Sequence, residues 1–295
     1  MTGSPTGVLR DYVPLLKLKI GLFITLSAVV GALLTGRGRI GIFDLIGLSV
    51  VLLLGSAAAS VYNHYHDRDI DAVMARTKDR PIASGRLRSL NAVLFLGAVL
   101  MAASLVLAFA LFNLVVALHV LAGAFVYAVV YTVWLKRRSV LNIVIGGLAG
   151  SFAVLAGAAS VTPELCAPPL LLALVMFFWT PSHFWSLAIA CRSDYARAGV
   201  PMLPVVVGNV RAARYLFANT VLLVLASIGL WLWGGMGLVY LLPAVGVGAF
   251  FLYRNAQLLR DASQGTAWSN FKASMAYLAI LYLAVIADVA SASFR

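Results

Sequence analysis

Residues 89–135 contain no Asp, Glu, Lys or Arg. One continuous helix through this stretch would be about 70 Å long at about 1.5 Å per residue, more than twice the roughly 30 Å of hydrocarbon in a bilayer. The stretch must therefore fold back on itself, and we expect the turn near Phe112-Asn113. An uncharged run of this length predicts two membrane-spanning helices.

The rest of the chain repeats this pattern of apolar runs and short polar breaks. Only 11 % of the residues are charged, against roughly 25 % in soluble domains, and the mean hydropathy is +0.98. The prolines of "TPELCAPP" divide one long run, and "GGMG" divides another. We predict an all-α membrane protein with one domain, residues 1–295, and nine transmembrane helices at about 20–36, 45–66, 89–111, 114–135, 139–161, 169–191, 215–233, 238–253 and 273–294.

The charge of the loops predicts the orientation of these helices. With the N-terminus in the cytoplasm, 19 of the 22 Lys and Arg residues fall in inside loops and 3 fall outside, as the positive-inside rule requires. The C-terminus is then outside, and the loops 67–88 and 192–214 face the cytoplasm. These loops account for the net charge of +12, so we expect no nucleic-acid binding.

Several isolated residues carry simpler expectations. Cys166 and Cys191 fall on opposite membrane sides, so they predict no disulfide. The first 19 residues have no separate apolar core, so we expect no cleavable signal peptide. Asp44 and Asp288 lie near outer helix ends and are expected to be solvated, whereas His119 is expected to form a hydrogen bond to a neighbouring helix.

The stretch "YNHYHDRDIDAVMARTKDRP", residues 62–81, holds four of the ten acidic residues. Asn63, Asp67 and Asp71 are spaced by four, so on a helix they stack along one face. Like charges at that spacing repel each other, and the C-terminal end of a helix disfavours anions. Carboxylates with an amide oxygen suit Mg²⁺, which typically uses one or two carboxylates together with substrate phosphates. Asp69 and Asp79 are expected to be solvated or paired with bases.

Basic residues lie on the same membrane side as this acidic face. Arg76, Lys78 and Arg80 follow it directly, and "LKRR" occupies residues 135–138. A metal beside bases is suited to binding a diphosphate. A second polar loop, "CRSDYARAGVPMLP" at 191–204, comes four helices later, as an internal repeat would place it. Taken singly, each base fits an ordinary cytoplasmic loop equally well.

Four segments together resemble the UbiA-type intramembrane prenyltransferases. They are "NHYHDRDIDAVMARTKDRPIASGRL" at 63–87, "YTVWLKRRSVLNIVIGGLAG" at 131–150, "WTPSHFWSLAI" at 179–189 and "DYARAGVPMLPVV" at 194–206. They occur in family order, and the resemblance covers nearly the whole chain. The Pro-Met-Leu-Pro run and the Trp…His-Phe segment favour the haem-modifying branch of the family.

The resemblance implies transfer of the farnesyl group of farnesyl diphosphate to the 2-vinyl group of haem b, giving haem O for terminal oxidases. It implies Mg²⁺ as the cofactor and an enzyme integral to the bacterial cytoplasmic (inner) membrane, with its active site facing the cytoplasm. Besides the two substrates and the lipid bilayer, a haem A synthase or an oxidase assembly factor is an expected partner, because the product is hydrophobic.

The resemblance also assigns residues. The implied metal ligands are Asn63, Asp67, Asp71 and Asp194, although Asp194 could instead hold a basic partner; the implied catalytic residues are Asp67, Asp71 and Lys136. The implied diphosphate-binding residues are Lys19, Arg76, Arg80, Tyr131, Lys136, Arg137, Arg138 and Arg192. The implied haem or acceptor residues are His183, Trp179, Asn142 and Tyr195, and Tyr127, Tyr131, Phe178 and Trp179 are candidates to line an aromatic pocket for the farnesyl cation.

Alternatives remain open at this point. His183 could ligate iron, contact a propionate or simply form a hydrogen bond within the bundle. His64 and His66 are expected to be rim residues. A quinone precursor or another aromatic molecule could replace haem as the acceptor. A secondary transporter is a third alternative, but transporter sites usually lie near the bilayer midplane, whereas these acids are expected at the membrane rim.

Overall fold

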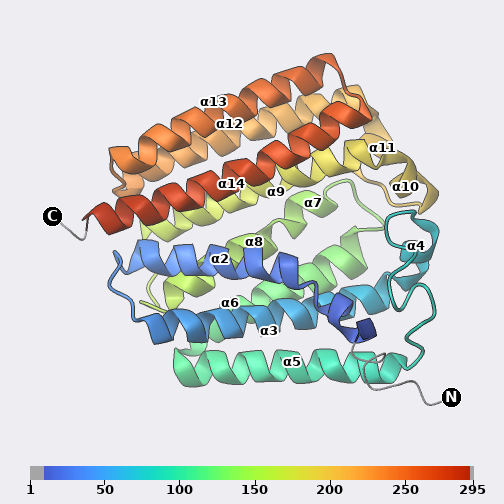
Figure 1. The fold of residues 1–295 in the computed structure, drawn as a ribbon, viewed down its shortest axis with the longest axis horizontal. Coiled ribbons are helices and arrows are strands. Elements are labelled where there is room, and N and C mark those ends of the chain that lie inside the picture. Colours follow the sequence, from blue (N-terminus) through green and yellow to red (C-terminus); the bar gives the residue numbers. More distant parts are fainter. Residues whose placement is uncertain (1–9, 293–295) are drawn as a thin grey trace.

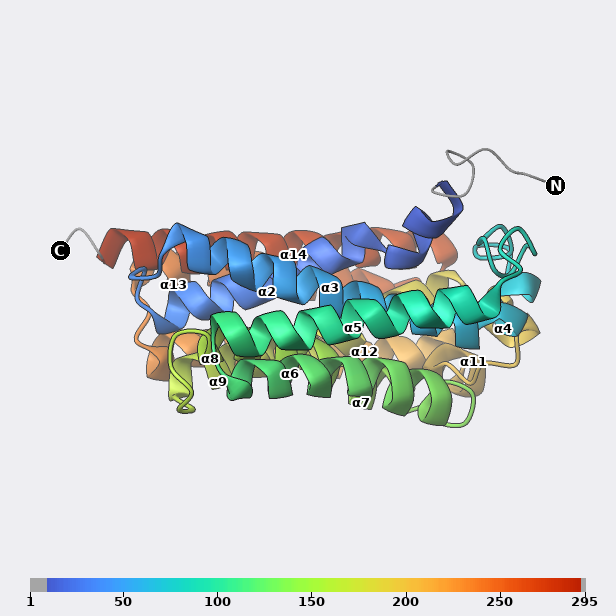
Figure 2. The same cartoon turned by 90° about the horizontal axis from the view of Figure 1, so that it is seen from below.

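The structure is a computed structural model that describes residues 10–292. In this range it contains helices and no strand, and nine helical stretches are long and apolar enough to cross a membrane. The all-α, nine-helix prediction is confirmed. The helices run along the long axis of the molecule, and the described chain begins at one end and finishes at the other (Figures 1 and 2).

The spans consist of these elements. The first four are η1 (Val13–Leu16) with α2 (Leu18–Thr35), α3 (Ile42–His66), α5 (Leu90–Leu111), and α6 (Leu114–Phe125) continued by the π-helix η2 (Val126–Leu135). The others are α7 (Asn142–Gly146) with α8 (Leu148–Ala159), α9 (Ala167–Ala190), α12 (Asn209–Gly234), α13 (Leu238–Arg260) and α14 (Gln264–Ala292). Short helices α4 (Arg68–Val73), α10 (Arg192–Arg197) and α11 (Leu203–Val207) lie together at one end, called here the α4 end (Figure 1).

The last three helices extend beyond the membrane spans expected from the sequence. The structure begins α12 at 209 rather than 215, extends α13 to 260 rather than 253, and begins α14 at 264 rather than 273. The expected ends were placed where charged residues begin. Lys and Arg are good helix formers, so these helices continue past the apolar run.

The core of the bundle contains tyrosines whose hydroxyl groups are all paired. Tyr277 shares a hydrogen bond of 2.6 Å with Ser227 Oγ, and Tyr240 donates to the Ser227 carbonyl at 2.8 Å. Tyr282 donates to Ser27 Oγ at 2.9 Å, which joins α14 to α2. Hydrocarbon offers no partner for a polar group, so such pairs between helices fix their arrangement.

Glycines bring α2 and α8 into close contact. A Cβ added at Gly31 would lie 2.3 Å from the Val154 carbonyl oxygen, and one added at Gly157 would lie 1.8 Å from the Ala28 carbonyl oxygen. Neither backbone can accept a side chain at these points. Small residues therefore set the position of α2, whose first turn enters the polar cluster described below.

Asp288 differs from the expectation of a solvated carboxylate. The residue is only 6 % exposed, and its carboxylate accepts hydrogen bonds from the backbone N–H groups of Gly237 at 2.8 Å and Tyr240 at 3.2 Å. A helix N-terminus has unpaired N–H groups and attracts negative charge. Asp288 on α14 therefore caps α13 from a neighbouring helix.

The other isolated residues give mixed outcomes. Asp44 is exposed, as expected, and Cys166 and Cys191 flank opposite ends of α9. The expectation for His119 was wrong, because its Nδ1 pairs at 2.8 Å with the Val115 carbonyl on its own helix. In apolar surroundings a carbonyl one turn away satisfies the ring without a partner helix.

Candidate active site

Asn63, Asp67 and Asp71 lie on one buried face across the junction of α3 and α4. The Asp67 N–H donates to the Asn63 carbonyl at 2.9 Å, and the Asp71 N–H donates to the Asp67 carbonyl at 2.8 Å. The helical hydrogen-bond register therefore continues through the junction. The three residues are 3 %, 0 % and 2 % exposed. Buried carboxylates require compensating charge.

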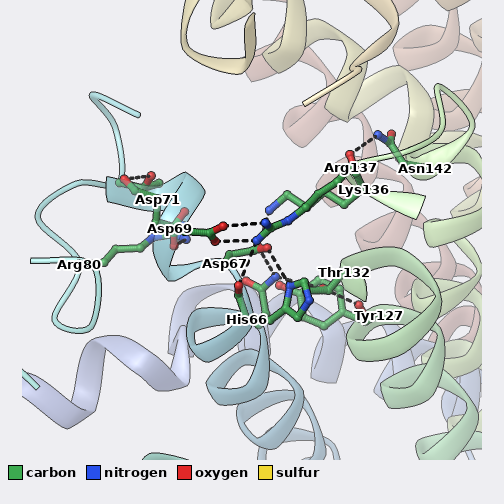
Figure 3. A network of polar contacts seen from close by, with 12 residues as sticks. His66, Asp67, Asp69, Asp71, Arg80, Tyr127, Thr132, Lys136, Arg137 and Asn142 are labelled. Carbon is green, nitrogen blue, oxygen red and sulfur yellow. Dashed lines mark hydrogen bonds and ion pairs between the residues drawn. The ribbon is translucent and has the colours of Figure 1, made fainter. Parts of the chain in front are cut away.

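A basic side chain reaches each of these three residues. Lys136 pairs with Asp67 Oδ2, and Arg80 donates to Asp71 Oδ2 at 2.6 Å (Figure 3). The three bases are Lys17, Arg80 and Lys136. They come from the start of α2, the loop after α4 and the end of η2, respectively. The cluster therefore depends on the complete fold.

Lys17 completes this set, and the sequence prediction had assigned Lys19 instead. Lys17 Nζ donates to Asn63 Oδ1 at 2.7 Å and to the Tyr127 hydroxyl at 3.3 Å, whereas Lys19 is exposed on α2. Lys17 has the left-handed backbone angles φ 44° and ψ 48° between η1 and α2, an uncommon conformation for a residue with a side chain. Pro14, the second residue of η1, was the sequence signal for this break.

The π-helix η2 positions both Lys136 and a threonine. The Lys136 N–H donates to the Tyr131 carbonyl at 2.8 Å, and Thr132 Oγ1 donates to the Tyr127 carbonyl at 2.8 Å. Thr132 Oγ1 also accepts a hydrogen bond of 3.1 Å from Asn63 Nδ2. This contact fixes the Asn63 amide with its oxygen turned away from η2. π-Helical segments recur at functional sites, and sequence reasoning missed Thr132.

Arg137 does not join the buried cluster. Its guanidinium makes two hydrogen bonds to the Asp69 carboxylate, at 2.6 and 2.7 Å, and one of 3.1 Å to the His66 carbonyl. These bonds lower the pKa of Asp69 to about 2. Asp69 is a salt-bridge partner, as predicted. Arg138 and Arg192, two other expected diphosphate contacts, are exposed.

Asp194 on α10 connects the second polar loop to the first. It is buried, pairs with Arg197, and accepts a hydrogen bond of 3.4 Å from the Arg76 backbone N–H. Neighbouring Tyr195 is 7 % exposed, and burial raises its pKa. The structure gives Asp194 a basic partner, one of the two options that the sequence left open.

His183 on α9 lies between two aromatic rings. Its ring centroid is 4.4 Å from Trp179 and 4.3 Å from Phe271, and its Nδ1 lies 2.8 Å from Ser274 Oγ. The Ser274 hydroxyl donates to the Phe271 carbonyl at 2.6 Å. Nδ1 must therefore be the donor to Ser274, which leaves the lone pair of Nε2 for another partner.

Asn142 and His64 lie in surroundings that differ from those expected from the sequence. Asn142 is completely buried and donates to the Lys136 carbonyl at 3.3 Å (Figure 3), so it supports the turn that carries Lys136. His64 was expected at the rim, but it is only 3 % exposed. The alternation of buried and exposed positions within one helical turn cannot be read from a run as polar as "NHYH".

Comparison with known proteins decides the family. The UbiA prenyltransferase family model matches residues 24–281. The chain belongs to the UbiA prenyltransferase family. Two proteins of Paramagnetospirillum magneticum (strain ATCC 700264 / AMB-1), named protoheme IX farnesyltransferase 1 and 2, are 52 % and 47 % identical to this UbiA-family chain. The alignments cover 95 % and 96 % of the chain and 98 % of each relative.

Solved structures share the UbiA fold. A digeranylgeranylglyceryl phosphate synthase superposes with a TM-score of 0.78 at 22 % identity, covering 95 % of this chain and 98 % of that one. A UbiA homologue from Archaeoglobus fulgidus bound to DMAPP and Mg²⁺ superposes with a TM-score of 0.66 at 19 % identity. That alignment covers 94 % of this chain and 99 % of the homologue.

The buried face of this UbiA-family member has the donor set of a magnesium site. Within residues 10–292, no three His, Cys, Asp or Glu side chains converge to form a self-sufficient metal site. Mg²⁺ needs fewer protein ligands, because phosphate oxygens and waters complete its shell. Asp67 and Asp71 supply carboxylates, and Asp67 Oδ1 is buried without a hydrogen-bond partner in the described chain. These residues fit Mg²⁺ held jointly with a diphosphate.

Proposed function

We propose that the chain transfers the farnesyl group of farnesyl diphosphate to the 2-vinyl group of haem b. Diphosphate leaves and water adds a hydroxyl group, giving haem O for terminal oxidases. The observation that carries the proposal is near-full-length identity of 52 % to a protein named protoheme IX farnesyltransferase 1. The buried cluster supports the reaction type, because it joins the donor set of a magnesium site to three bases at one end of a membrane bundle.

Ionisation of the diphosphate is the step that this cluster favours. Negative charge grows on the leaving diphosphate as the allylic C–O bond breaks. Lys17, Arg80 and Lys136 are already in place, so they stabilise the transition state more than the ground state. Bound Mg²⁺, held by Asn63, Asp67 and Asp71, would supply further positive charge to the phosphate oxygens.

Two stacked tyrosines lie beside these bases. The rings of Tyr127 and Tyr131 are 5.9 Å apart and 12° from parallel, and Lys17 and Lys136 lie 6.0 and 5.8 Å from the respective ring centroids. Aromatic faces attract cations. We assign these rings to the allylic cation, which also needs a site with little water.

The acceptor is assigned to the group around His183. Nε2 is the ring atom left to contact haem, either at the iron or at a propionate, and Trp179 stacks on the opposite face from Phe271. Imidazole is a common iron ligand. Tyr195 packs in one apolar cluster with Met74 and Phe184, and the Phe184 ring lies 5.1 Å from that of His183. We assign a second Mg²⁺ or a basic partner to Asp194.

Positive loops support an active site that faces the cytoplasm of a bacterial inner membrane. A haem A synthase or an oxidase assembly partner would then receive the hydrophobic product. The test is a product assay in membranes supplied with farnesyl diphosphate, haem b and Mg²⁺, read by the mass of haem O. Farnesylated quinone precursor without haem O would favour the aromatic-acceptor alternative.

A further inference from the structure

The ring of His64 is buried without a hydrogen-bond partner. The residue is 3 % exposed, and neither ring nitrogen has a partner in the described chain. A buried polar group left unpaired is costly, and most such groups in proteins have a partner. An unpaired imidazole therefore points to a ligand that the surrounding protein atoms do not replace.

His64 lines a cavity of about 410 Å³ that is bordered by the loop after α4. Four basic side chains, Lys17, Arg76, Arg80 and Arg86, line the same cavity with one carboxylate, Asp79. The cavity shares Lys17 and Arg80 with the buried acidic face, where they bond Asn63 and Asp71. A ligand in this cavity would therefore lie next to the candidate magnesium ligands.

The charge of the lining identifies the class of ligand. Arg86 donates to Asp11 at 3.0 Å and to the Asp79 carbonyl at 2.8 Å, which holds it at the rim. Arg76 is also exposed, whereas Lys17 and Arg80 are partly buried and bond the acidic face. Lys17, Arg80 and Lys136 all act electrostatically on the His64 ring. An imidazole offers at least one N–H donor in either tautomer. An anion with several oxygen acceptors satisfies both the ring and the bases.

We propose that His64 is a further substrate-binding residue, which donates a ring N–H to an oxygen of the diphosphate group of the prenyl donor. This inference rests on the proposed function only in taking a prenyl diphosphate as substrate. Asn63 and His64 are consecutive on α3, so their side chains point about 100° apart around the helix. One would hold the metal and the other the phosphate oxygens on the adjacent side.

The first test measures binding of inorganic diphosphate with Mg²⁺ to purified protein by calorimetry. His64→Phe should raise the dissociation constant for diphosphate about tenfold, which is the effect of losing one hydrogen bond to a charged group. His64→Asn, which keeps an N–H donor, should recover part of the loss. His119→Phe makes the same chemical change on α6, where the ring bonds its own helix, and should bind as the wild type does.

Orthophosphate provides a second arm, because a free anion could occupy the same cavity. A loss with diphosphate that is larger than the loss with orthophosphate supports the assignment. Unchanged diphosphate binding by His64→Phe, or a loss confined to orthophosphate, would overturn it. Haem O formation is scored separately: wild type that binds diphosphate through His64 but makes no haem O would contradict the proposed acceptor and leave this inference standing.

A spectroscopic measurement covers the case in which His64→Phe does not fold. The chain has four histidines, so ¹⁵N-histidine spectra of the wild type are simple, and His64→Asn and His119→Phe assign two of them. Adding diphosphate and Mg²⁺ should shift the ring nitrogens of His64 and leave those of His119 in place. Ring signals of His64 that stay unmoved at saturating diphosphate would also overturn the assignment.

Discussion

Lys17 Nζ donates a hydrogen bond of 2.7 Å to Asn63 Oδ1, and this bond joins the first turn of α2 to the end of α3. The lysine reaches Asn63 from a left-handed backbone conformation, which costs on the order of 1 kcal/mol for a residue with a side chain. Unfavourable backbone geometry at a point of polar convergence is typical of functional sites. Lys17 is therefore the base whose substitution distinguishes this site from an ordinary basic loop.

Lys17→Met should lower kcat/KM for the prenyl diphosphate about a hundredfold, since it removes one preplaced charge from the leaving group. The loss of kcat/KM caused by Lys19→Met should be at least tenfold smaller, because Lys19 is exposed. Steady-state kinetics with purified enzyme compares the two variants. Equal losses would mean that the structure assigns the wrong lysine to the site.

Lys136→Met should lower both activity and stability. Asp67 is fully buried, and removal of one partner of a buried pair leaves an uncompensated charge, at about 3–5 kcal/mol. The double variant Asp67→Asn with Lys136→Met should recover much of the melting temperature and none of the haem O yield. Thermal unfolding in detergent and the product assay measure the two effects. Recovery of activity in the double variant would argue against a catalytic contribution from this pair.

Thr132→Val should raise the Mg²⁺ concentration needed for half-maximal activity about tenfold, because Asn63 loses the hydroxyl that orients its amide. Thr132→Ser keeps the hydroxyl and should behave as the wild type does. A magnesium titration of the haem O yield, started from chelator-treated protein, measures the effect. Identical magnesium titrations for Thr132→Val and the wild type would show that η2 does not position the metal ligands.

The Arg137–Asp69 pair should contribute little and should stay charged over the working pH range. The pKa of Asp69 is lowered from 3.8 to about 2 in the folded protein, so its stabilising effect is complete above the unfolded value and is lost as pH falls towards 2. Asp69→Asn should therefore lower the melting temperature by a small, constant amount from pH 8 to pH 5. A difference that changed between pH 8 and pH 5 would contradict this assignment.

His183→Ala should abolish haem O formation while leaving diphosphate binding intact, because the His183 ring contacts Trp179, Phe271 and Ser274 rather than the bases. Calorimetry with diphosphate and Mg²⁺ checks the second half of this expectation. Loss of diphosphate binding, or an unchanged haem O yield, would refute the acceptor assignment.

Much of this architecture could be predicted from the sequence. The uncharged run 89–135 and the loop charges required nine spans, and the spacing of Asn63, Asp67 and Asp71 required one helix face. Both follow from short-range periodicity, which the fold preserves.

The contacts that the sequence did not predict have a common physical cause. Lys17 lies 46 residues from Asn63, and a left-handed turn rather than helical periodicity brings it there. Thr132 depends on a π-helix, whose register cannot be told from that of an α-helix by composition. Asp288 caps the N-terminus of α13, which lies 51 residues earlier in the chain. Each contact is fixed by packing between distant segments.

The most direct measurement is the product formed by membranes containing this chain when supplied with farnesyl diphosphate, haem b and Mg²⁺. The account predicts a new haem with the mass of haem O, lost with chelator and lost in Asp67→Ala and Asp71→Ala. Absence of haem O from wild-type membranes that still bind Mg²⁺ and diphosphate, or undiminished haem O from both aspartate variants, would contradict it.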